Sequence, residues 1–105
     1  MGWIAVDLDG TLAHWENGQW PEIGTPVPKM QARVKSWLSR GKTVKIFTAR
    51  VSGDDSEGQR SRIETWCKEN LGEVLKVTNR KDDQMDEIWD DIEEQFETIT
   101  DWNNE

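Results

Sequence analysis

The stretch Trp3-Ile4-Ala5-Val6-Asp7-Leu8-Asp9-Gly10-Thr11 decides the fold that this sequence predicts. Residues 3–8 are nearly all apolar and form a short run, which is typical of a strand buried on both faces of a parallel sheet. A Gly-Thr pair ends the strand and leaves Asp7 and Asp9 at its carboxyl end. Ligands of open parallel sheets bind outside the carboxyl ends of the strands, so we expect both carboxylates to lie at a binding site.

Two helices are predicted from apolar residues that recur at helical spacing. The first begins near Pro28, which suits a first helical turn, and stops at Gly41. The second begins at Ser56, which with Gln59 resembles a capping box, and ends before Gly72. The side chains expected to be buried are Met30, Val34, Trp37 and Leu38 in the first helix and Ile63, Trp66, Cys67 and Leu71 in the second.

Short apolar runs predict three further strands, at residues 43–47, 75–77 and 87–89. Alternation of strands with helices is typical of a parallel α/β sheet. We therefore predict one α/β domain over residues 1–105, a small open parallel sheet with helices on both faces, Rossmann-like in arrangement. The segment after Asp91 is compatible with a helix or a strand, and its apolar spacing favours a helix.

A β-hairpin is predicted over about residues 13–21, between the first strand and the first helix. Its turn would be Asn17-Gly18, because both residues tolerate the positive φ of a type I′ turn. Such a turn would pair Trp15 with Trp20 on one face of the hairpin. The two indoles either stabilise the hairpin or stack on a flat leaving group, and the sequence leaves both interpretations open.

Composition limits the partners that the protein can have. A net charge of -8 argues against non-specific binding to nucleic acid or anionic membranes. It does not exclude a small phosphorylated substrate or a phosphorylated nucleic-acid end, because a bound divalent cation can reverse the local charge. The single cysteine, Cys67, excludes an intramolecular disulfide and fits a reducing cytoplasm. No apolar run approaches the ~20 residues of a membrane span, so we expect a cytoplasmic protein, of undetermined oligomeric state.

Polar residues follow the end of every predicted strand. They are Asp7 and Asp9 after the first strand, Thr48 after the second, Lys81 after the third, and Asp90 and Asp91 after the fourth. Because the carboxyl ends of parallel strands meet at one edge of a sheet, these side chains are expected to converge.

This ordered set resembles the motifs of the haloacid dehalogenase (HAD) superfamily of phosphatases. Asp7-Leu8-Asp9-Gly10-Thr11 resembles the first motif, while Thr48, Lys81 and the pair Asp90-Asp91 resemble the second, third and fourth. The resemblance covers residues 1–91 and is strongest to short members of bacteriophage type, which would place the protein in the host cytoplasm. It implies a HAD-type fold in which the hairpin is a flap over the site. No cap domain fits between the first two motifs.

The resemblance implies a Mg²⁺-dependent phosphomonoester hydrolase. Asp7 would be the nucleophile that forms an aspartyl-phosphate, and Asp9 the general acid and then the base. The residues implied to bind the substrate's phosphate are Thr48, Lys81, Ala49, Arg50 and Thr11. Arg50 is equally compatible with covering a helix.

The resemblance also implies which groups hold the metal: Asp7, the carbonyl oxygen of Asp9, and one member of the pair Asp90-Asp91, with Asp91 favoured. Clustered carboxylates repel one another unless a cation lies among them, and an all-oxygen ligand set with room for waters favours Mg²⁺.

Two other functions share features with this pattern. A response-regulator receiver also uses acidic residues, Thr and Lys around a parallel sheet, but its phosphoacceptor should follow the third strand, whereas Asp7 follows the first. The alternative that stays open is a non-catalytic HAD-like module that binds phosphate or a partner protein. Neither the substrate nor the pathway follows from the sequence.

Overall fold

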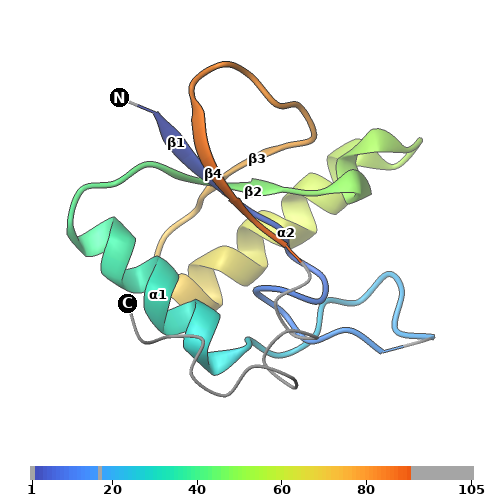
Figure 1. The fold of residues 1–105 in the computed structure, drawn as a ribbon. Helices are drawn as coiled ribbons and strands as arrows, with labels where there is room; N and C mark the ends of the chain where they lie inside the picture. Colours follow the sequence, from blue (N-terminus) through green and yellow to red (C-terminus); the bar gives the residue numbers. More distant parts are fainter. Residues whose placement is uncertain (1, 17, 91–105) are drawn as a thin grey trace.

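A computed structural model describes residues 2–16 and 18–90 of the chain. The elements, in chain order, are β1 (Trp3–Val6), α1 (Pro28–Ser39), β2 (Val44–Phe47), the 3₁₀ helix η1 (Ala49–Ser52), α2 (Ser56–Leu71), β3 (Lys76–Thr78) and β4 (Met85–Trp89) (Figure 1). The α/β class and all four predicted strands are confirmed. The prediction of a C-terminal helix falls outside the described residues.

All four strands form one parallel sheet in the order β3-β2-β1-β4. Strand β1 therefore has a hydrogen-bonded neighbour on each side, and its residues are all buried, as its apolar run predicts. The register pairs Val6 with Ile46 of β2 and with Trp89 of β4. The carboxyl ends of these three strands consequently meet at one edge of the sheet.

Both described helices cover the same face of the sheet, which differs from the predicted arrangement with helices on both faces. Helices α1 and α2 contact each other. One apolar core joins them to alternate strand residues, among them Val6, Ile46 and Val77, which the register places on one face. The physical reason is the strand order: two crossovers of the same hand, from β1 to β2 and from β2 to β3, advance in one direction and so deliver their helices to the same side.

The first turn of α1, its buried face and the end of α2 match their sequence signals. Pro28 occupies the first turn of α1, and Met30, Val34 and Trp37 are buried against the sheet. Helix α2 ends at Gly72, whose φ of 87° is the left-handed conformation that glycine adopts most readily. In the part of the chain that the structure describes, no helix combines the length and the apolar character needed to cross a membrane.

The predicted capping box at the start of α2 is wrong. Ser56 is the first helical residue, the N-cap position belongs to Asp55, and no side chain caps it. The side chain of Gln59 is buried, donates to Asp55 Oδ2 at 3.4 Å and accepts a hydrogen bond from Arg50. The local sequence pattern predicts that Gln59 caps the helix, but in the structure its side chain makes a long-range hydrogen bond with Arg50.

The predicted hairpin is present only as a tight turn. The Gln19 N–H donates to the Glu16 carbonyl at 3.2 Å, but the described residues of 13–21 contain no strand pair. An isolated antiparallel bridge, Ala13 with Pro26, closes the wider loop instead. Pro21 has no N–H to donate, so a strand ladder cannot continue through it. The turn residue Asn17 lies outside the described residues.

Candidate active site

Asp7 is positioned by the two strands that end beside it. Its N–H donates to the Trp89 carbonyl of β4 at 2.9 Å, which extends the pairing of β1 with β4 by one residue. Its carboxylate oxygen Oδ1 accepts the Leu8 N–H at 2.8 Å. The side chain is therefore oriented by backbone at the carboxyl end of the central strand, where ligands of parallel sheets bind.

A pocket of about 350 Å³ opens at this edge of the sheet. Such a volume lies near the lower end of the roughly 300–1,000 Å³ typical of small-molecule sites. Its lining consists of Asp7, Asp9, Trp15, Trp20, Thr48, Ala49 and Arg50. The structure thus brings together both predicted catalytic carboxylates, three of the predicted phosphate-binding residues and the two indoles.

Thr48 connects this pocket to the end of β2. Its N–H donates to the Thr78 carbonyl of β3 at 2.9 Å, and its hydroxyl oxygen accepts the Arg50 N–H at 3.1 Å. The hydroxyl therefore caps η1 while the residue lines the pocket. A cap of this kind fixes where the hydroxyl oxygen lies, and a hydroxyl can still donate its own proton to a ligand.

Arg50 is the most extensively bonded side chain of the site. Its Nε and Nη2 donate to Oδ2 and Oδ1 of Asp9, at 2.7 and 2.9 Å. Its remaining N–H groups donate to the Pro21 carbonyl at 2.7 Å, the Glu22 carbonyl at 3.0 Å and the Gln59 Oε1 at 3.0 Å. All five donors of the guanidinium are therefore engaged within the protein.

This bonding bears on the two roles predicted for Arg50. Only 2% of its side chain is exposed, and a substrate phosphate could accept from it only if one of the five bonds broke. Its guanidinium instead joins Asp9, the loop before α1 and helix α2. Both Asp9 oxygens accept one N–H each from Arg50, so the pair is bidentate.

The two indoles lie at the mouth of the pocket. Trp20 is 55% exposed and Trp15 is 39% exposed. The Arg50 guanidinium carbon lies 4.6 Å from the centre of the Trp20 ring, within cation–π range. One face of the Trp20 ring is therefore covered by a fixed cation.

Two predicted phosphate-binding residues do not line this pocket. Lys81 is exposed in the turn between β3 and β4, and the Thr11 side chain is fully buried in the turn after β1. The Thr11 N–H donates to the Leu8 carbonyl at 3.2 Å, so this residue helps to build the turn that presents Asp9.

The predicted metal ligands are described in part. Asp90 follows β4 immediately after Trp89, whose carbonyl accepts the Asp7 N–H, but its side chain is exposed and does not line the pocket. Asp91 lies outside the described residues. Within residues 2–16 and 18–90, no three His, Cys, Asp or Glu side chains are grouped closely enough to hold a metal ion. The donors present, the Asp7 carboxylate and the Asp9 carbonyl, are hard oxygens of the kind that Mg²⁺ takes.

Gln59 is a contributor to the site that the sequence analysis missed. The sequence pattern predicts a helix-capping role for Gln59, yet Gln59 lies four residues before the buried Ile63 and so on the apolar face of α2. A polar residue at such a position is usually buried with a partner, and this was the available signal. Its partner is Arg50.

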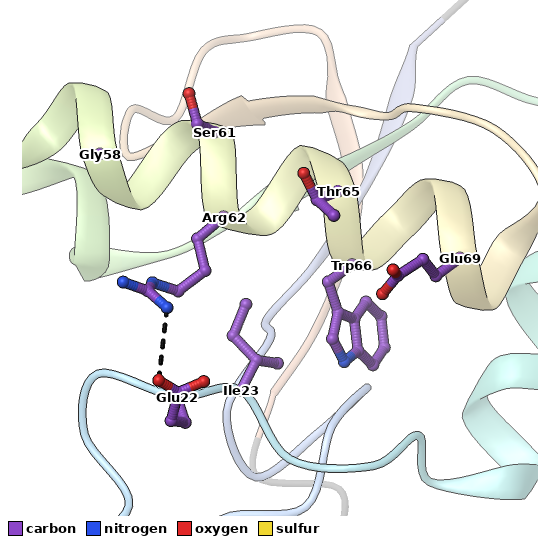
Figure 2. Close-up of a pocket in the computed structure, with 8 residues that line it drawn as sticks. All are labelled: Glu22, Ile23, Gly58, Ser61, Arg62, Thr65, Trp66 and Glu69. Carbon is purple, nitrogen blue, oxygen red and sulfur yellow. Dashed lines mark ion pairs between the residues drawn. The ribbon is translucent and has the colours of Figure 1, made fainter.

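A second, larger pocket lies between α2 and the segment that precedes α1 (Figure 2). It has a volume of about 520 Å³ and is lined by Glu22, Ile23, Gly58, Ser61, Arg62, Thr65, Trp66 and Glu69. Its ion pair joins the half-buried Arg62 to the exposed Glu22 at 3.5 Å. The Trp66 indole N–H donates to the Gly24 carbonyl at 2.8 Å. These contacts explain how α2 holds the segment. The two carboxylates of this pocket, Glu22 and Glu69, lie away from the carboxyl ends of the strands, so the smaller pocket is the candidate active site.

No protein-family model, curated protein or solved structure matches this chain.

Proposed function

We propose that this chain is a Mg²⁺-dependent phosphomonoester hydrolase that works through an aspartyl-phosphate on Asp7. One observation carries the proposal: Asp7, Asp9 and Thr48 line a single pocket at the carboxyl edge of adjacent parallel strands. Their order in the chain is that of the HAD motifs that the sequence resembles. Separate strand ends have no structural need to present this combination at one place.

The proposed reaction has two displacements at phosphorus. A carboxylate oxygen of Asp7 attacks the phosphorus as the bond to the leaving oxygen breaks, and Asp9 supplies the proton that this oxygen takes up. A water molecule then attacks the phosphorus, Asp9 accepts its proton, and the Asp7 carboxylate is released with inorganic phosphate. The Leu8 N–H on Asp7 Oδ1 supports this role, because it holds the nucleophile in one orientation.

The metal would be held by the Asp7 carboxylate and the Asp9 carbonyl, with one member of the pair Asp90-Asp91 as the further ligand. When bound, Mg²⁺ would neutralise the phosphate oxygens that face the Asp7 carboxylate. Thr48 would donate its hydroxyl hydrogen to a phosphate oxygen.

The second candidate function is a non-catalytic module that binds a phosphate group or a partner. The Arg50–Asp9 pair favours it, because a bidentate ion pair gives Asp9 a role that needs no catalysis. In a working hydrolase, the proton that Asp9 carries must occupy a lone pair that Arg50 does not use.

The test is phosphate release from a panel of nucleotides, sugar phosphates and phosphorylated oligonucleotides, with wild-type protein and Asp7→Asn. We expect wild type to release phosphate only with Mg²⁺, EDTA to abolish the activity, and Asp7→Asn to be folded and inactive. Acid quenching during turnover should leave phosphate on Asp7. The matched control is Asp54→Asn, which removes an equal charge from an exposed loop and should retain full activity.

Two results would contradict the proposal. One is phosphate trapped on a residue other than Asp7. The other is a wild-type protein that binds phosphate esters with Mg²⁺ and hydrolyses none of the panel, which would favour the non-catalytic module.

A further inference from the structure

We propose that Trp20 is a stacking surface for the base of a nucleoside phosphate whose phosphate group occupies the Asp7 pocket. The proposal rests on the proposed function, which it deepens by naming the substrate class. The ligand chemistry is a planar aromatic group joined, through a sugar, to a phosphomonoester.

The first observation is the exposure of Trp20. Three other indoles of the described chain, Trp3, Trp37 and Trp66, are each no more than 7% exposed, as expected for a side chain with so much apolar area. Trp20 and Trp15 are 55% and 39% exposed, and both line the pocket that holds the paired carboxylates. Exposed aromatic area is thus concentrated at the mouth of the candidate active site.

The second observation is that the Trp20 ring is backed by a cation. The Arg50 guanidinium lies 4.6 Å from the ring centre and is itself fixed by five hydrogen bonds. With that contact on one side, an indole that remains 55% exposed offers its other side to a ligand. A ring held in this way loses little conformational freedom when a ligand stacks on it.

The chemistry of the pocket selects a nucleoside phosphate from among aromatic ligands. Every nucleobase has a flat face that stacks on an aromatic side chain, whatever its hydrogen-bonding edge. The polar end of the pocket, Asp7 and Thr48, would take the phosphate group. A net charge of -8 disfavours a long nucleic-acid tract, but it allows a mononucleotide or the terminal nucleotide of a strand.

The experiment compares KM and kcat for 3′- and 5′-nucleoside monophosphates with those for glucose 6-phosphate and glycerol phosphate. The proteins are wild type, Trp20→Leu, Trp20→Phe and Val74→Ala, which alters a 54% exposed apolar residue that does not line the pocket. We expect Trp20→Leu to raise KM for nucleotides about tenfold or more, and to leave KM for glucose 6-phosphate within about twofold. Trp20→Phe should recover most of the nucleotide affinity, and Val74→Ala should resemble wild type.

The nucleoside phosphate that binds could be a free mononucleotide or the terminal nucleotide of a strand. Oligonucleotides with a terminal phosphate, measured in the same assay, distinguish these two substrates. A lower KM for them than for mononucleotides would identify strand ends as the substrate, and the reverse order would identify free nucleotides. In both cases the Trp20 dependence must persist. Equal losses on nucleotides and sugar phosphates with a lower melting temperature would overturn the proposal and leave Trp20 as a loop support.

A binding measurement keeps failure of this proposal distinct from failure of the proposed function. Equilibrium dialysis measures the affinity for AMP and needs no hydrolysis. The two proteins compared are Asp7→Asn and the double variant that also carries Trp20→Leu. We expect binding of AMP to weaken about tenfold in the double variant. Unchanged AMP affinity overturns the stacking surface even if the enzyme hydrolyses phosphate esters, whereas a Trp20-dependent affinity supports it even if no hydrolysis occurs.

Discussion

Arg50 holds both carboxylate oxygens of Asp9, through Nε to Oδ2 at 2.7 Å and Nη2 to Oδ1 at 2.9 Å. Two parallel bonds of this kind fix the plane of a carboxylate as well as its position, which a single ammonium group cannot do. Arg50 follows β2 and Asp9 follows β1, so the pair ties together two strand ends. The orientation of the proposed acid therefore depends on a residue 41 positions along the chain.

Arg50→Lys should lower both stability and turnover. Lysine keeps the charge but has three donors in place of five, and a hydrogen bond that involves a charged group contributes about 1.5–3 kcal/mol. We expect urea unfolding to show a loss of about this size and kcat to fall for substrates with poor leaving groups. The matched control is Arg40→Lys, an exposed arginine that bonds only within its own helix end and should change neither quantity.

A double-mutant cycle tells positioning of Asp9 apart from direct substrate binding. If Arg50 acts through Asp9, the effects on kcat of Arg50→Lys and Asp9→Asn should be strongly non-additive. Additive effects, or a rise in KM without loss of kcat, would show instead that Arg50 contacts the substrate.

Asp9→Asn should slow hydrolysis according to the leaving group. An alkoxide leaving group needs a proton, and loss of a general acid typically costs 10²–10⁴-fold in rate. A nitrophenolate leaves without a proton, so p-nitrophenyl phosphate should suffer far less in the first step. The check is the ratio of kcat/KM for glycerol phosphate to that for p-nitrophenyl phosphate. Equal losses on both substrates would remove the acid role from Asp9.

The sequence predicts secondary structure well where the spacing of apolar residues within one segment determines it. The apolar run before Asp7 and the helical stripes through Val34 and Ile63 predicted the strands, the helices and their buried faces. Where contacts join distant segments, the local patterns failed. Gln59 matches a capping box in sequence, yet its side chain accepts a hydrogen bond from Arg50 instead of capping the helix. Helices α1 and α2 cover the same face of the sheet because of the order of its strands. The periodicity of apolar residues in a helix does not reveal that order.

The candidate site was predictable to a similar extent. The carboxyl ends of the strands placed Asp7, Asp9 and Thr48 correctly, because parallel strands must end at one edge. Arg50 was expected to contact substrate or to cover a helix, and its saturation by five protein acceptors could not be foreseen. Those acceptors belong to three separate segments that only the folded chain brings together.

Cys67 should resist thiol reagents in the folded protein. Burial raises the pKa of its thiol to about 11, so little reactive thiolate exists at pH 8, and the sulfur is also inaccessible. We expect modification by dithionitrobenzoate at pH 8 to be slow in buffer and fast in denaturing urea. As a control, a free thiol peptide should react rapidly in both solutions. Rapid labelling without urea would show that the apolar face of α2 opens readily.

Asp82 should contribute stability that disappears in acid. The Trp3 indole N–H donates to its Oδ1 at 2.8 Å, and this bond, followed by one from the Gln84 N–H, lowers the pKa of the carboxyl from its usual 3.8. A group whose pKa is lower in the folded state stabilises the fold at pH values above its unfolded pKa. That contribution is lost as the pH falls from about 3.8 through the folded value. Below that range the carboxyl is protonated in both states.

Trp3→Phe is the variant that tests this link, because it removes the indole donor and keeps an aromatic ring at a buried position of β1. We expect its acid-unfolding midpoint to move to higher pH, and the stability it loses at pH 7 to shrink as the pH approaches 3. Phenylalanine is also smaller than tryptophan, and that packing loss should be independent of pH, so the slope of unfolding free energy against pH isolates the carboxyl. Asp82→Asn should flatten the same slope, and Asp83→Asn controls for the change in net charge. A loss in Trp3→Phe that is equal at pH 7 and pH 3 would show that the indole stabilises β1 by packing alone.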